Sequence, residues 1–457
     1  MKALKIADIL EATGGRLLSN GGNEEIFSIS TDSRKIEKGC LFVPLAGENF
    51  DGHNFIDSAV QNGAAAVLTH NGEMPQNADG VCIIGVENTM DALGNIAGLY
   101  RSMFKIPAIS ITGSVGKTTT KEMCAEVLSA KYNVHKNKGN FNNEIGVPLT
   151  IFGLDDMHDL LISEMGMSGF GEIDRISKMV KPEIVIMTNI GMSHIEMLGS
   201  QENIYKAKSE FLNNMNPEGT IIINGDDKIL LSHKDELGKH VITVGIKNED
   251  CDLVAKNINS DSEGVSFEVH GMDECFAVKL SVPGEHNVYN ALCACAVGML
   301  CRVSNEEMAS ALANFTPDSM RMCVIERDDM TIINDCYNAA PDSVTAALKV
   351  LSGYEGRKVA VLGNIACLGQ FAYSAHKNLG AEVCKNEIDI LVTIGEHARL
   401  IGEGAFENGM DSAKIFSFDS VEEALGQIHS IIRLKDTILI KASRVMKLER
   451  ITEFLTK

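Results

Sequence analysis

The sequence lacks any stretch that is typical of a disordered linker, a membrane span or a secretion signal. Its 457 residues include no proline-rich, glycine-serine or single-residue tract, so every segment is expected to fold. No apolar run approaches the length of a membrane-spanning helix. Residues 1–15 place acidic residues among apolar ones, as an amphipathic helix does, and lack the apolar core of a signal peptide. We therefore expect a globular cytoplasmic protein without stable membrane association.

Paired cysteines and an excess of positive charge are also missing. None of the twelve cysteines belongs to a CxxC pair, and most lie in apolar stretches, as Cys293 and Cys295 do. This pattern predicts reduced, mostly buried thiols instead of a disulfide framework or a zinc site. The net charge of -21 argues against a broad surface for nucleic acid or an anionic membrane, because such binding depends on neutralising phosphates. Anionic ligands are expected only in local pockets.

The sequence contains a regular alternation of short Val/Ile-rich runs and helical patterns, which is typical of buried parallel strands joined by crossover helices. The predicted strands are residues 108–112, 160–164, 184–188 and 220–224 in a first set, and 331–334, 359–363, 390–395 and 438–441 in a second. Between the sets, at about 255–283, polar and apolar residues alternate and predict a small antiparallel excursion before a helix that starts near His286. No repeat of fixed period is visible, which argues against a solenoid. The predicted fold class is α/β, and the length favours three domains, residues 1–104, 105–316 and 317–457.

The strongest local signal is a phosphate-binding loop within residues 108–123, AISITGSVGKTTTKEM. A β-branched strand ends at Thr112, and a predicted helix opens at Lys117. Glycines let backbone N–H groups approach phosphate oxygens, the helix N-terminus favours an anion, the lysine supplies a mobile cation, and the hydroxyl of Thr118 can ligate magnesium. The residues expected to contact a nucleotide are Gly113, Ser114, Val115, Gly116, Lys117, Thr118 and Thr119.

The general P-loop pattern is not fully met, because Ile111 stands where a glycine is usual. An ordinary strand-to-helix turn is the alternative, although strand, glycines, lysine and threonines occur in the order that a P-loop requires. The loop alone predicts binding of a nucleoside triphosphate and leaves GTPases, kinases and ligases open.

The loop and several later motifs resemble the Mur ligases, whose shortened loop TG(S/T)xGKT is similar to TGSVGKTTT here. The resemblance covers nearly the whole chain and includes NFNNEIGVPLT (140–150), SEMGMSGFGEI (163–173), TNIGMSHIEMLGS (188–200), KAKSEF (206–211), PGEHNVYNAL (283–292), MRM (320–322) and INDCYNAAPDS (333–343). Members of this family use ATP to convert a substrate carboxylate into an acyl phosphate, which an amine then converts into an amide. The resemblance implies an ATP- and Mg²⁺-dependent ligase of peptidoglycan precursor synthesis, with a P-loop central domain and a Rossmann-like C-terminal domain.

The resemblance assigns roles to residues around the phosphates. Lys117 is the catalytic cation, Thr118 and Glu164 are Mg²⁺ ligands, and His194 is similar to the family's ligand for a second Mg²⁺. Glu164 ends a predicted strand, where a magnesium-binding carboxylate is expected; the alternative is a solvated acid that begins a loop. Lys208 matches the lysine that related ligases carry as a carbamate, an acquired anion at the metal site. Its alternative is an exposed helical lysine.

Other residues resemble the family's contacts to the rest of ATP. Asn287 and Asn290 are similar to adenine-contacting asparagines, and Arg321 and Asp335 are similar to residues that reach ATP from the C-terminal domain. Asparagine offers a donor and an acceptor to a base edge, and arginine offers a forked cation to phosphate. Each could instead cap a helix or form a surface ion pair. The residues expected to bind the other substrates are Thr31, Ser33, Arg34, Asn142, Asn143, Tyr337 and Asn338.

The N-terminal segment, residues 28–67, looks like the uridine-nucleotide domain of the family members that add the third residue or the terminal dipeptide. Thr31, Ser33 and Arg34 would face UDP, although TDSR is also a suitable plain turn. YNAAPDS and ILIKASRVMKLERI, together with the lack of a DNPR signature, resemble the members that join D-alanyl-D-alanine to UDP-N-acetylmuramoyl-tripeptide. The resemblance thus implies those two partners and a monomer. Two alternatives stay open: a paralogue that joins another amine or acid, and a non-catalytic nucleotide-binding regulator.

The chain departs from those members at three places that follow predicted strands. Where they usually read GDMxELG, this chain has Asn364 and Cys367 in place of the aspartate and the glutamate. Where they read YNANP and KGSR, it has Ala340 in place of the second asparagine and Ala442 in place of the glycine. The first change removes two carboxylates, and Ala442 adds a methyl group where glycine allows close backbone approach. Because the amine is expected at the carboxyl ends of the strands, weaker binding of the dipeptide's ammonium is expected, with neutral drift as the alternative.

Overall fold

The computed structural model describes residues 1–47, 50–70, 74, 79–262, 264–327 and 330–456, so residues 48 and 49 of the N-terminal motif lie outside the described part. Contacts divide the chain into two compact units. The first comprises Met1–Ile111, Tyr132–Val185 and Ala207–Gly219, and the second comprises Thr112–Lys131, Ile186–Lys206 and Thr220–Lys457. Within the described residues, no helix combines the length and apolar composition that crossing a bilayer requires.

The N-terminal part of the first unit contains a five-stranded sheet in the order β2-β9-β8-β5-β4. Strands β4, β5, β8 and β9 pair in parallel, whereas β2 pairs antiparallel to β9. The strands are β2 (Arg16–Ser19), β4 (Ser28–Ser30), β5 (Cys40–Phe42), β8 (Ala66–His70) and β9 (Cys82–Val86). Two small pairs accompany this sheet, namely β1 (Leu4–Lys5) with β3 (Glu25–Ile26) and β6 (Ala46–Gly47) with β7 (Phe50–Asp51).

The helices of this part are α1 (Ile6–Thr13), α2 (Ile56–Gln61) and α3 (Thr89–Ser102), with the 3-10 turns η1 (Ser33–Lys35) and η2 (Gly52–Phe55). Helix α1 buries Ile6 and Ile9, as the predicted amphipathic N-terminal helix requires. Asn88 caps α3 by accepting from the Met90 and Asp91 N–H groups.

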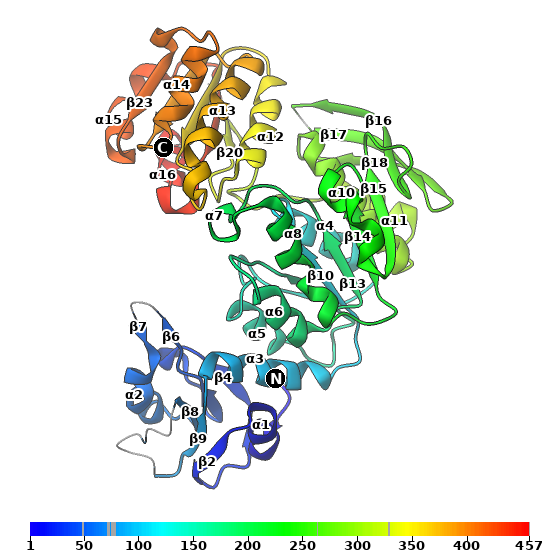
Figure 1. The fold of residues 1–457 in the computed structure, drawn as a ribbon, viewed down its shortest axis with the longest axis vertical. Coiled ribbons are helices and arrows are strands. Elements are labelled where there is room, and N and C mark those ends of the chain that lie inside the picture. Colours follow the sequence, from blue (N-terminus) through cyan, green and yellow to red (C-terminus); the bar gives the residue numbers. More distant parts are fainter. Residues whose placement is uncertain (48–49, 71–73, 75–78, 263, 328–329, 457) are drawn as a thin grey trace. The chain divides into compact units, whose positions relative to one another are not determined.

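A nine-stranded sheet follows, in the order β11-β12-β10-β13-β14-β15-β16-β17-β18. Strands β10, β11 and β12 pair in parallel, as do β14, β15 and β16, whereas β17 pairs antiparallel with both β16 and β18. The strands are β10 (Ala108–Thr112), β11 (Val134–Lys136), β12 (Leu160–Glu164), β13 (Ile184–Met187), β14 (Thr220–Asn224), β15 (His240–Gly245), β16 (Leu253–Asp261), β17 (Gly264–Gly271) and β18 (Glu274–Leu280). The antiparallel hairpins β16 to β18 confirm the predicted excursion, and they are the light green arrows of Figure 1.

The helices between these strands and after them are α4 (Lys117–Ser129), α5 (Gly146–Ile151), α6 (Glu172–Val180), α7 (Ile195–Leu198), α8 (Gln201–Ser209), α9 (Lys228–Ser232), α10 (Glu285–Leu300) and α11 (Asn305–Ala313), with η3 (Glu210–Asn213) and η4 (Lys234–Leu237). Helix α10 begins one residue before His286, so the predicted helix start is confirmed. Ser304 and Glu307 form a capping box at the start of α11.

The C-terminal part of the second unit is a six-stranded sheet in the order β19-β20-β24-β21-β22-β23, parallel except at the β19–β20 pair. Its strands are β19 (Cys323–Arg327), β20 (Met330–Asn334), β21 (Lys358–Gly363), β22 (Ile390–Ile394), β23 (Ile415–Phe418) and β24 (Thr437–Lys441). Its helices are α12 (Pro341–Ser352), α13 (Ala372–Lys385), α14 (Arg399–Glu407), α15 (Val421–Ile431) and α16 (Glu449–Leu455), with η5 (Gly369–Phe371), η6 (Ser412–Lys414) and η7 (Arg444–Met446). Val361, Val392 and Ile440, all fully buried, belong to its hydrophobic core.

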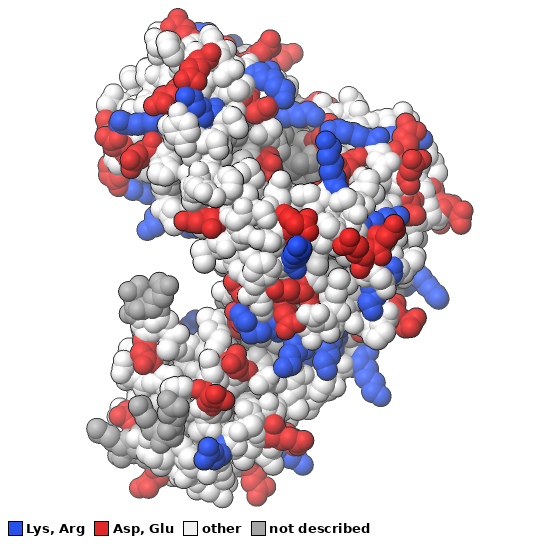
Figure 2. Space-filling model, viewed as in Figure 1, with Lys and Arg blue, Asp and Glu red and all other residues white. Residues whose placement is uncertain are grey.

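The α/β fold class is confirmed, and each of the eight predicted strands is present with ends that differ by at most one residue. The cysteine prediction is confirmed in part. All twelve cysteines are free thiols, but only six are buried, and Cys275 and Cys367 are exposed. On the face shown in Figure 2, acidic and basic side chains are intermixed.

Candidate active site

The segment after β10 forms a tight loop that leads into α4. Gly113 and Gly116 have φ values of +143° and +83°, which glycine adopts without strain. A Cβ atom on Gly116 would lie 2.8 Å from Asn290 Oδ1, so space also requires glycine there. Helix α4 begins at Lys117 with thirteen residues, and its first N–H groups and its dipole favour a bound anion.

The Lys117 side chain folds over this loop. Its Nζ donates to the carbonyl oxygens of Gly113 at 2.9 Å and Ser114 at 3.2 Å. The hydroxyl-bearing Thr118 is 7% exposed in the first turn of α4. A cation and a hydroxyl therefore stand at the N-terminus of the helix, as binding of phosphate and magnesium requires.

Glu164 is the last residue of β12 and is only 2% exposed, so the alternative of a solvated acid is wrong. Its backbone N–H donates to Asn137 Oδ1 at 2.9 Å, and its Oε1 accepts from Asn142 Nδ2 at 2.7 Å. Strand pairing places Glu164 beside Ile111, two residues before Gly113. The structure thus brings together two predicted residues, Glu164 and Asn142, and Asn142 orients the carboxylate. Their contacts to metal and substrate stay predictions.

Asn143, predicted beside Asn142 as a substrate contact, is exposed and already engaged. Its Oδ1 accepts from the N–H groups of Ile145 at 3.2 Å and Gly146 at 2.9 Å. The side chain therefore stabilises the turn that enters α5, and its role toward substrate stays a prediction.

Lys208 is 1% exposed near the end of α8, so the alternative of an exposed helical lysine is wrong. A buried ammonium is costly unless it is paired or chemically altered. His194 precedes α7 with a φ of +63°, an unusual conformation for a residue with a Cβ atom. This backbone conformation directs the chain from the β13 loop into α7.

The donors present suit Mg²⁺, which prefers hard oxygen ligands. A strand-end carboxylate at Glu164 and a helix-start hydroxyl at Thr118 supply such atoms. Across residues 1–47, 50–70, 74, 79–262, 264–327 and 330–456, no three His, Cys, Asp or Glu side chains form a ready metal cluster. Magnesium at nucleotide sites is typically held by one or two protein groups together with phosphates and water.

Asn287 and Asn290 lie on α10 and are 3% and 6% exposed. Asn290 Oδ1 accepts from the Thr120 hydroxyl at 3.0 Å, and its Nδ2 donates to Asn287 Oδ1 at 3.1 Å. Asn287 Nδ2 in turn donates to the Pro283 carbonyl at 2.8 Å. These bonds connect α10 to the phosphate-loop helix, and the predicted adenine contact stays a prediction.

Asp335, predicted to reach ATP, follows β20 and forms an ion pair with a residue that the sequence did not single out. Lys441 Nζ donates to Asp335 Oδ2 at 2.6 Å and to the Asn338 carbonyl at 3.0 Å. The Lys441 side chain is 3% exposed. The ion pair of Asp335 is therefore buried, and the alternative that Asp335 forms a surface ion pair is wrong. Lys441 ends a predicted buried strand, and a buried lysine needs an anionic partner. The sequence alone could therefore have indicated that Lys441 forms an ion pair. Desolvation lowers the pKa of nearby His286 to about 4, so this imidazole is neutral at pH 7.

Arg321 and Tyr337, both predicted site residues, lie together. The Arg321 guanidinium carbon is 4.0 Å from the centroid of the Tyr337 ring, a cation–π contact. Asn338 is exposed, and its carbonyl accepts from Lys441. The stacking fixes the guanidinium without using its five N–H donors on the ring, so these donors can bind a phosphate.

The N-terminal candidates follow β4. Asp32 accepts from the Arg34 backbone N–H at 3.1 Å and from its side chain at 2.9 Å through each of two nitrogens. The Arg34 side-chain hydrogen bonds are the main reason that the pKa of Asp32 falls to about 2. Asp32 and Arg34 therefore form the ordinary turn that was the alternative interpretation of TDSR. Ser33 is buried and Thr31 is half-buried, and the roles of Thr31, Ser33 and Arg34 toward UDP stay predictions.

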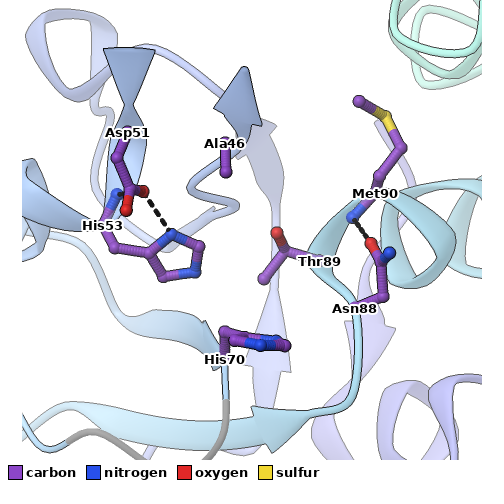
Figure 3. Close-up of a pocket in the computed structure, with 7 residues that line it drawn as sticks. All are labelled: Ala46, Asp51, His53, His70, Asn88, Thr89 and Met90. Carbon is purple, nitrogen blue, oxygen red and sulfur yellow. Dashed lines mark hydrogen bonds and ion pairs between the residues drawn. The ribbon is translucent and has the colours of Figure 1, made fainter. Parts of the chain in front are cut away.

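A cavity of about 280 Å³ in the first unit was not predicted (Figure 3). It lies where β8 ends and α3 begins, and it is lined by Ala46, Asp51, His53, His70, Asn88, Thr89 and Met90. His53 Nδ1 bonds Asp51 Oδ1 at 2.7 Å, whereas the buried His53 Nε2 has no hydrogen-bond partner among the described residues. The carboxylate fixes the ring and leaves Nε2 for a ligand. The acid and the histidine two residues later, in DGHNF, are the signal that sequence reasoning missed.

The four residues that depart from the family pattern differ in burial and in hydrogen bonding. Asn364 Oδ1 accepts from the Ala398 N–H at 2.8 Å, a bond that an aspartate would also make. Cys367 is exposed with a φ of +60°. The Ala442 methyl, which adds a group where glycine allows close backbone approach, lies inside the fold, and its effect on the amine stays a prediction. Ala442 is fully buried in the hydrophobic core, and its Cβ would be 2.7 Å from a Cβ on Gly363. Ala340, 6% exposed, is the N-cap residue before α12 and has no polar side-chain group.

Family models match three consecutive regions of the chain. The matches are the Mur ligase family, catalytic domain, over residues 25–101, the Mur ligase middle domain over residues 111–298, and the Mur ligase, glutamate ligase domain, over residues 320–444. The chain is 36% identical over 456 residues to the UDP-N-acetylmuramoyl-tripeptide--D-alanyl-D-alanine ligase of Bacillus subtilis (strain 168), covering 98% of this chain and 97% of that protein. It is 31% identical to the enzyme of the same name from Escherichia coli (strain K12), covering 100% and 99%.

Solved structures of Mur ligases also resemble this chain over nearly its full length. A crystal structure of MurF from Acinetobacter baumannii superposes with a TM-score of 0.91 and 31% identity, covering 100% of both chains. MurF ligase from Thermotoga maritima, solved in complex with ADP, has a TM-score of 0.84 and 28% identity, covering 93% of this chain and 96% of that one.

Proposed function

The chain belongs to the Mur ligase family, and on that premise we propose that it joins D-alanyl-D-alanine to UDP-N-acetylmuramoyl-tripeptide in an ATP-driven step of peptidoglycan precursor synthesis. The observation that carries this function is the full-length similarity to curated ligases of that name. It is supported by a strand, a glycine loop and a helix in the order that phosphate-binding loops have, with Lys117 at the start of the helix. An enzyme is favoured over a non-catalytic regulator because the chain has all five residues of the family's phosphate and metal site, Lys117, Thr118, Glu164, His194 and Lys208.

The reaction has two parts. An oxygen of the tripeptide carboxylate attacks the γ-phosphorus of ATP, the bond to ADP breaks, and an acyl phosphate forms. The amine nitrogen of the dipeptide then attacks the acyl carbon, phosphate leaves, and an amide forms as the nitrogen loses its proton. The protein contributes mainly positioning and neutralisation of charge.

Individual residues have the following proposed roles. Lys117 neutralises charge that develops on the transferred phosphoryl group. Mg²⁺, when bound, would neutralise charge on phosphate oxygens, with Thr118 and Glu164 as protein ligands of one ion and His194 as a ligand of a second ion. Lys208 carries a carbamate that adds an anion to this set. Asn287 and Asn290 face adenine, while Arg321 and Asp335 act on ATP from the C-terminal part.

We assign the three predicted domains to three substrates. Residues 1–104 bind the UDP-linked peptide through Thr31, Ser33 and Arg34, residues 105–316 bind ATP, and residues 317–457 contact ATP and the amine. Asn142, Asn143, Tyr337 and Asn338 complete the proposed substrate contacts. The enzyme works as a monomer in the cytoplasm, a reducing compartment that suits twelve free thiols.

The test is release of inorganic phosphate by the purified protein with Mg²⁺ and ATP. We expect release only when UDP-N-acetylmuramoyl-tripeptide and D-alanyl-D-alanine are both present. Release that needs the tripeptide but prefers another amine would favour the paralogue, and nucleotide binding without any release would favour the regulator.

The loop after β21 gives the paralogue alternative its support, because it lacks the two family carboxylates at Asn364 and Cys367. Restoring both, in Asn364→Asp with Cys367→Glu, should lower the Michaelis constant for D-alanyl-D-alanine about fivefold, since each exposed ion pair contributes at most about 1 kcal/mol. The ATP constant should not change. Steady-state kinetics with varied dipeptide measures this effect.

The control is Cys275→Glu with Gln427→Glu, which adds the same charge at exposed positions outside this loop. An unchanged dipeptide constant in the restored variant, combined with better use of another amine, would replace the proposed dipeptide activity with that of a paralogue.

A further inference from the structure

Two side chains that follow β13 enclose the backbone of Val115 in the phosphate loop. The Thr188 hydroxyl donates to the Val115 carbonyl at 2.6 Å. Asn189 Nδ2 donates to the same carbonyl at 3.2 Å, and Asn189 Oδ1 accepts from the Val115 N–H at 3.0 Å. One peptide position of the loop is therefore held at both its donor and its acceptor by residues more than 70 positions away in the sequence.

The neighbouring residue Ser114 is held by the same segment. Its N–H donates to the Asn189 carbonyl at 3.0 Å. The Gly191 N–H donates to Ser114 Oγ at 2.8 Å, and the Ser193 hydroxyl donates to the Ser114 carbonyl at 3.2 Å. The N–H groups of Ser114 and Val115 are therefore both hydrogen-bonded within the protein, so the segment after β13 fixes two consecutive residues of the loop.

The fit between the two segments leaves no spare room. A Cβ atom on Gly113 would lie 1.9 Å from Thr188 Oγ1 and 3.1 Å from Thr188 N. Thr188 is 5% exposed, and its N–H donates to the Thr112 carbonyl at 3.0 Å. The first loop glycine thus serves to admit the Thr188 side chain, in addition to giving the loop its conformation.

We propose that Thr188 and Asn189 are positioning residues that set the conformation of the phosphate loop and thereby the affinity for ATP. The proposal rests on the proposed function, because it requires that this loop takes the phosphates of ATP. The two residues act through Val115 and do not themselves contact nucleotide. We call Thr188 and Asn189, with their hydrogen bonds to Val115, the clamp. Because the segment that follows them continues to His194, the clamp also fixes the beginning of the loop that carries this proposed metal ligand.

The test compares variants that differ in single bonds. Thr188→Val removes the hydroxyl with little change in shape, whereas Thr188→Ser keeps it. Asn189→Asp keeps the acceptor for the Val115 N–H but places a carboxylate oxygen against the Val115 carbonyl. We expect the ADP dissociation constant, measured by calorimetry, and the ATP Michaelis constant to rise about fivefold in Thr188→Val and further in Asn189→Asp. Thr188→Ser should stay near wild type, and the dipeptide constant should change in none of them.

The matched control is Thr243→Val on β15. Thr243 is also a buried threonine, 2% exposed, and its hydroxyl donates to Asp252 at 2.7 Å. Thr243→Val should lower the melting temperature, as Thr188→Val does. It should leave the ADP dissociation constant and the ATP Michaelis constant unchanged. Unchanged nucleotide constants in Thr188→Val and Asn189→Asp would overturn the proposal, as would a Thr188→Ser variant as weak as Thr188→Val. If Asn189→Asp does not fold, the Thr188 pair decides alone.

Failure of the clamp and failure of the proposed function are distinguishable through Lys117→Ala. If that variant loses turnover while the Thr188 and Asn189 variants keep normal nucleotide constants, the loop binds ATP and only the clamp is wrong. If Lys117→Ala retains normal turnover, the loop is not the ATP site, and the clamp proposal is wrong with it. If the unaltered protein releases no phosphate when tripeptide and dipeptide are both present, the proposed function itself is wrong.

Discussion

Replacing Lys117 by alanine is expected to lower turnover about a hundredfold or more, because it removes a preorganised cation from the site where charge develops on the transferred phosphoryl group. In the structure this ammonium is held over the loop by two carbonyl oxygens, at 2.9 and 3.2 Å. Its position is therefore set before reaction. Phosphate release at saturating ATP, tripeptide and dipeptide measures the effect.

Lys228→Ala is the matched control, since Lys228 is likewise the first residue of a helix, α9, but is exposed. It should keep normal turnover. Near-normal turnover in Lys117→Ala would contradict the assignment of the loop to ATP, whereas a loss in both variants would indicate a general effect of removing a helix-start lysine.

Lys208→Ala is expected to be poorly active and partly rescued by a small carboxylic acid in the buffer. The proposed modification forms when the neutral amine attacks CO₂ and loses a proton, which replaces a cation with an anion. Lys208 is 1% exposed, so the space that its side chain leaves in the alanine variant is enclosed by protein. An acetate or formate ion can occupy the vacated space and restore the negative charge.

Lys206→Ala controls for the loss of a lysine from the same helix, because the Lys206 side chain is 60% exposed. It should need no rescue. Full activity of Lys208→Ala in the absence of any added acid would show that Lys208 has an ordinary structural role. The melting temperature of each variant separates loss of activity from loss of fold.

The strands were predictable because each is a short apolar run bounded by turn residues. The phosphate loop was predictable for a related reason, since its glycines, lysine and threonines are adjacent in sequence. Burial of Lys208 was not predictable. Lys206 and Lys208 lie about 200° apart around a helix, so one should be buried when the other is exposed, but the sequence does not say which.

Interactions between distant residues were also beyond sequence reasoning. Asp335 and Lys441 are 106 positions apart, and no local pattern connects them. Asn189 and Val115 are 74 positions apart, and the clamp exists only because β13 lies next to β10 in the sheet. The burial of Ala442 was not predictable for the same reason, because its methyl group lies where a side chain on Gly363 of β21 would otherwise be.

The central claim is that ATP activates the tripeptide carboxylate for attack by D-alanyl-D-alanine. Its most direct test uses UDP-N-acetylmuramoyl-tripeptide with ¹⁸O in the reacting carboxylate, followed by mass spectrometry of the amide product and of the released phosphate. We predict one ¹⁸O atom in each phosphate formed, together with a UDP-linked pentapeptide that retains the other ¹⁸O atom. Phosphate without label, or phosphate release without the pentapeptide, would contradict the account.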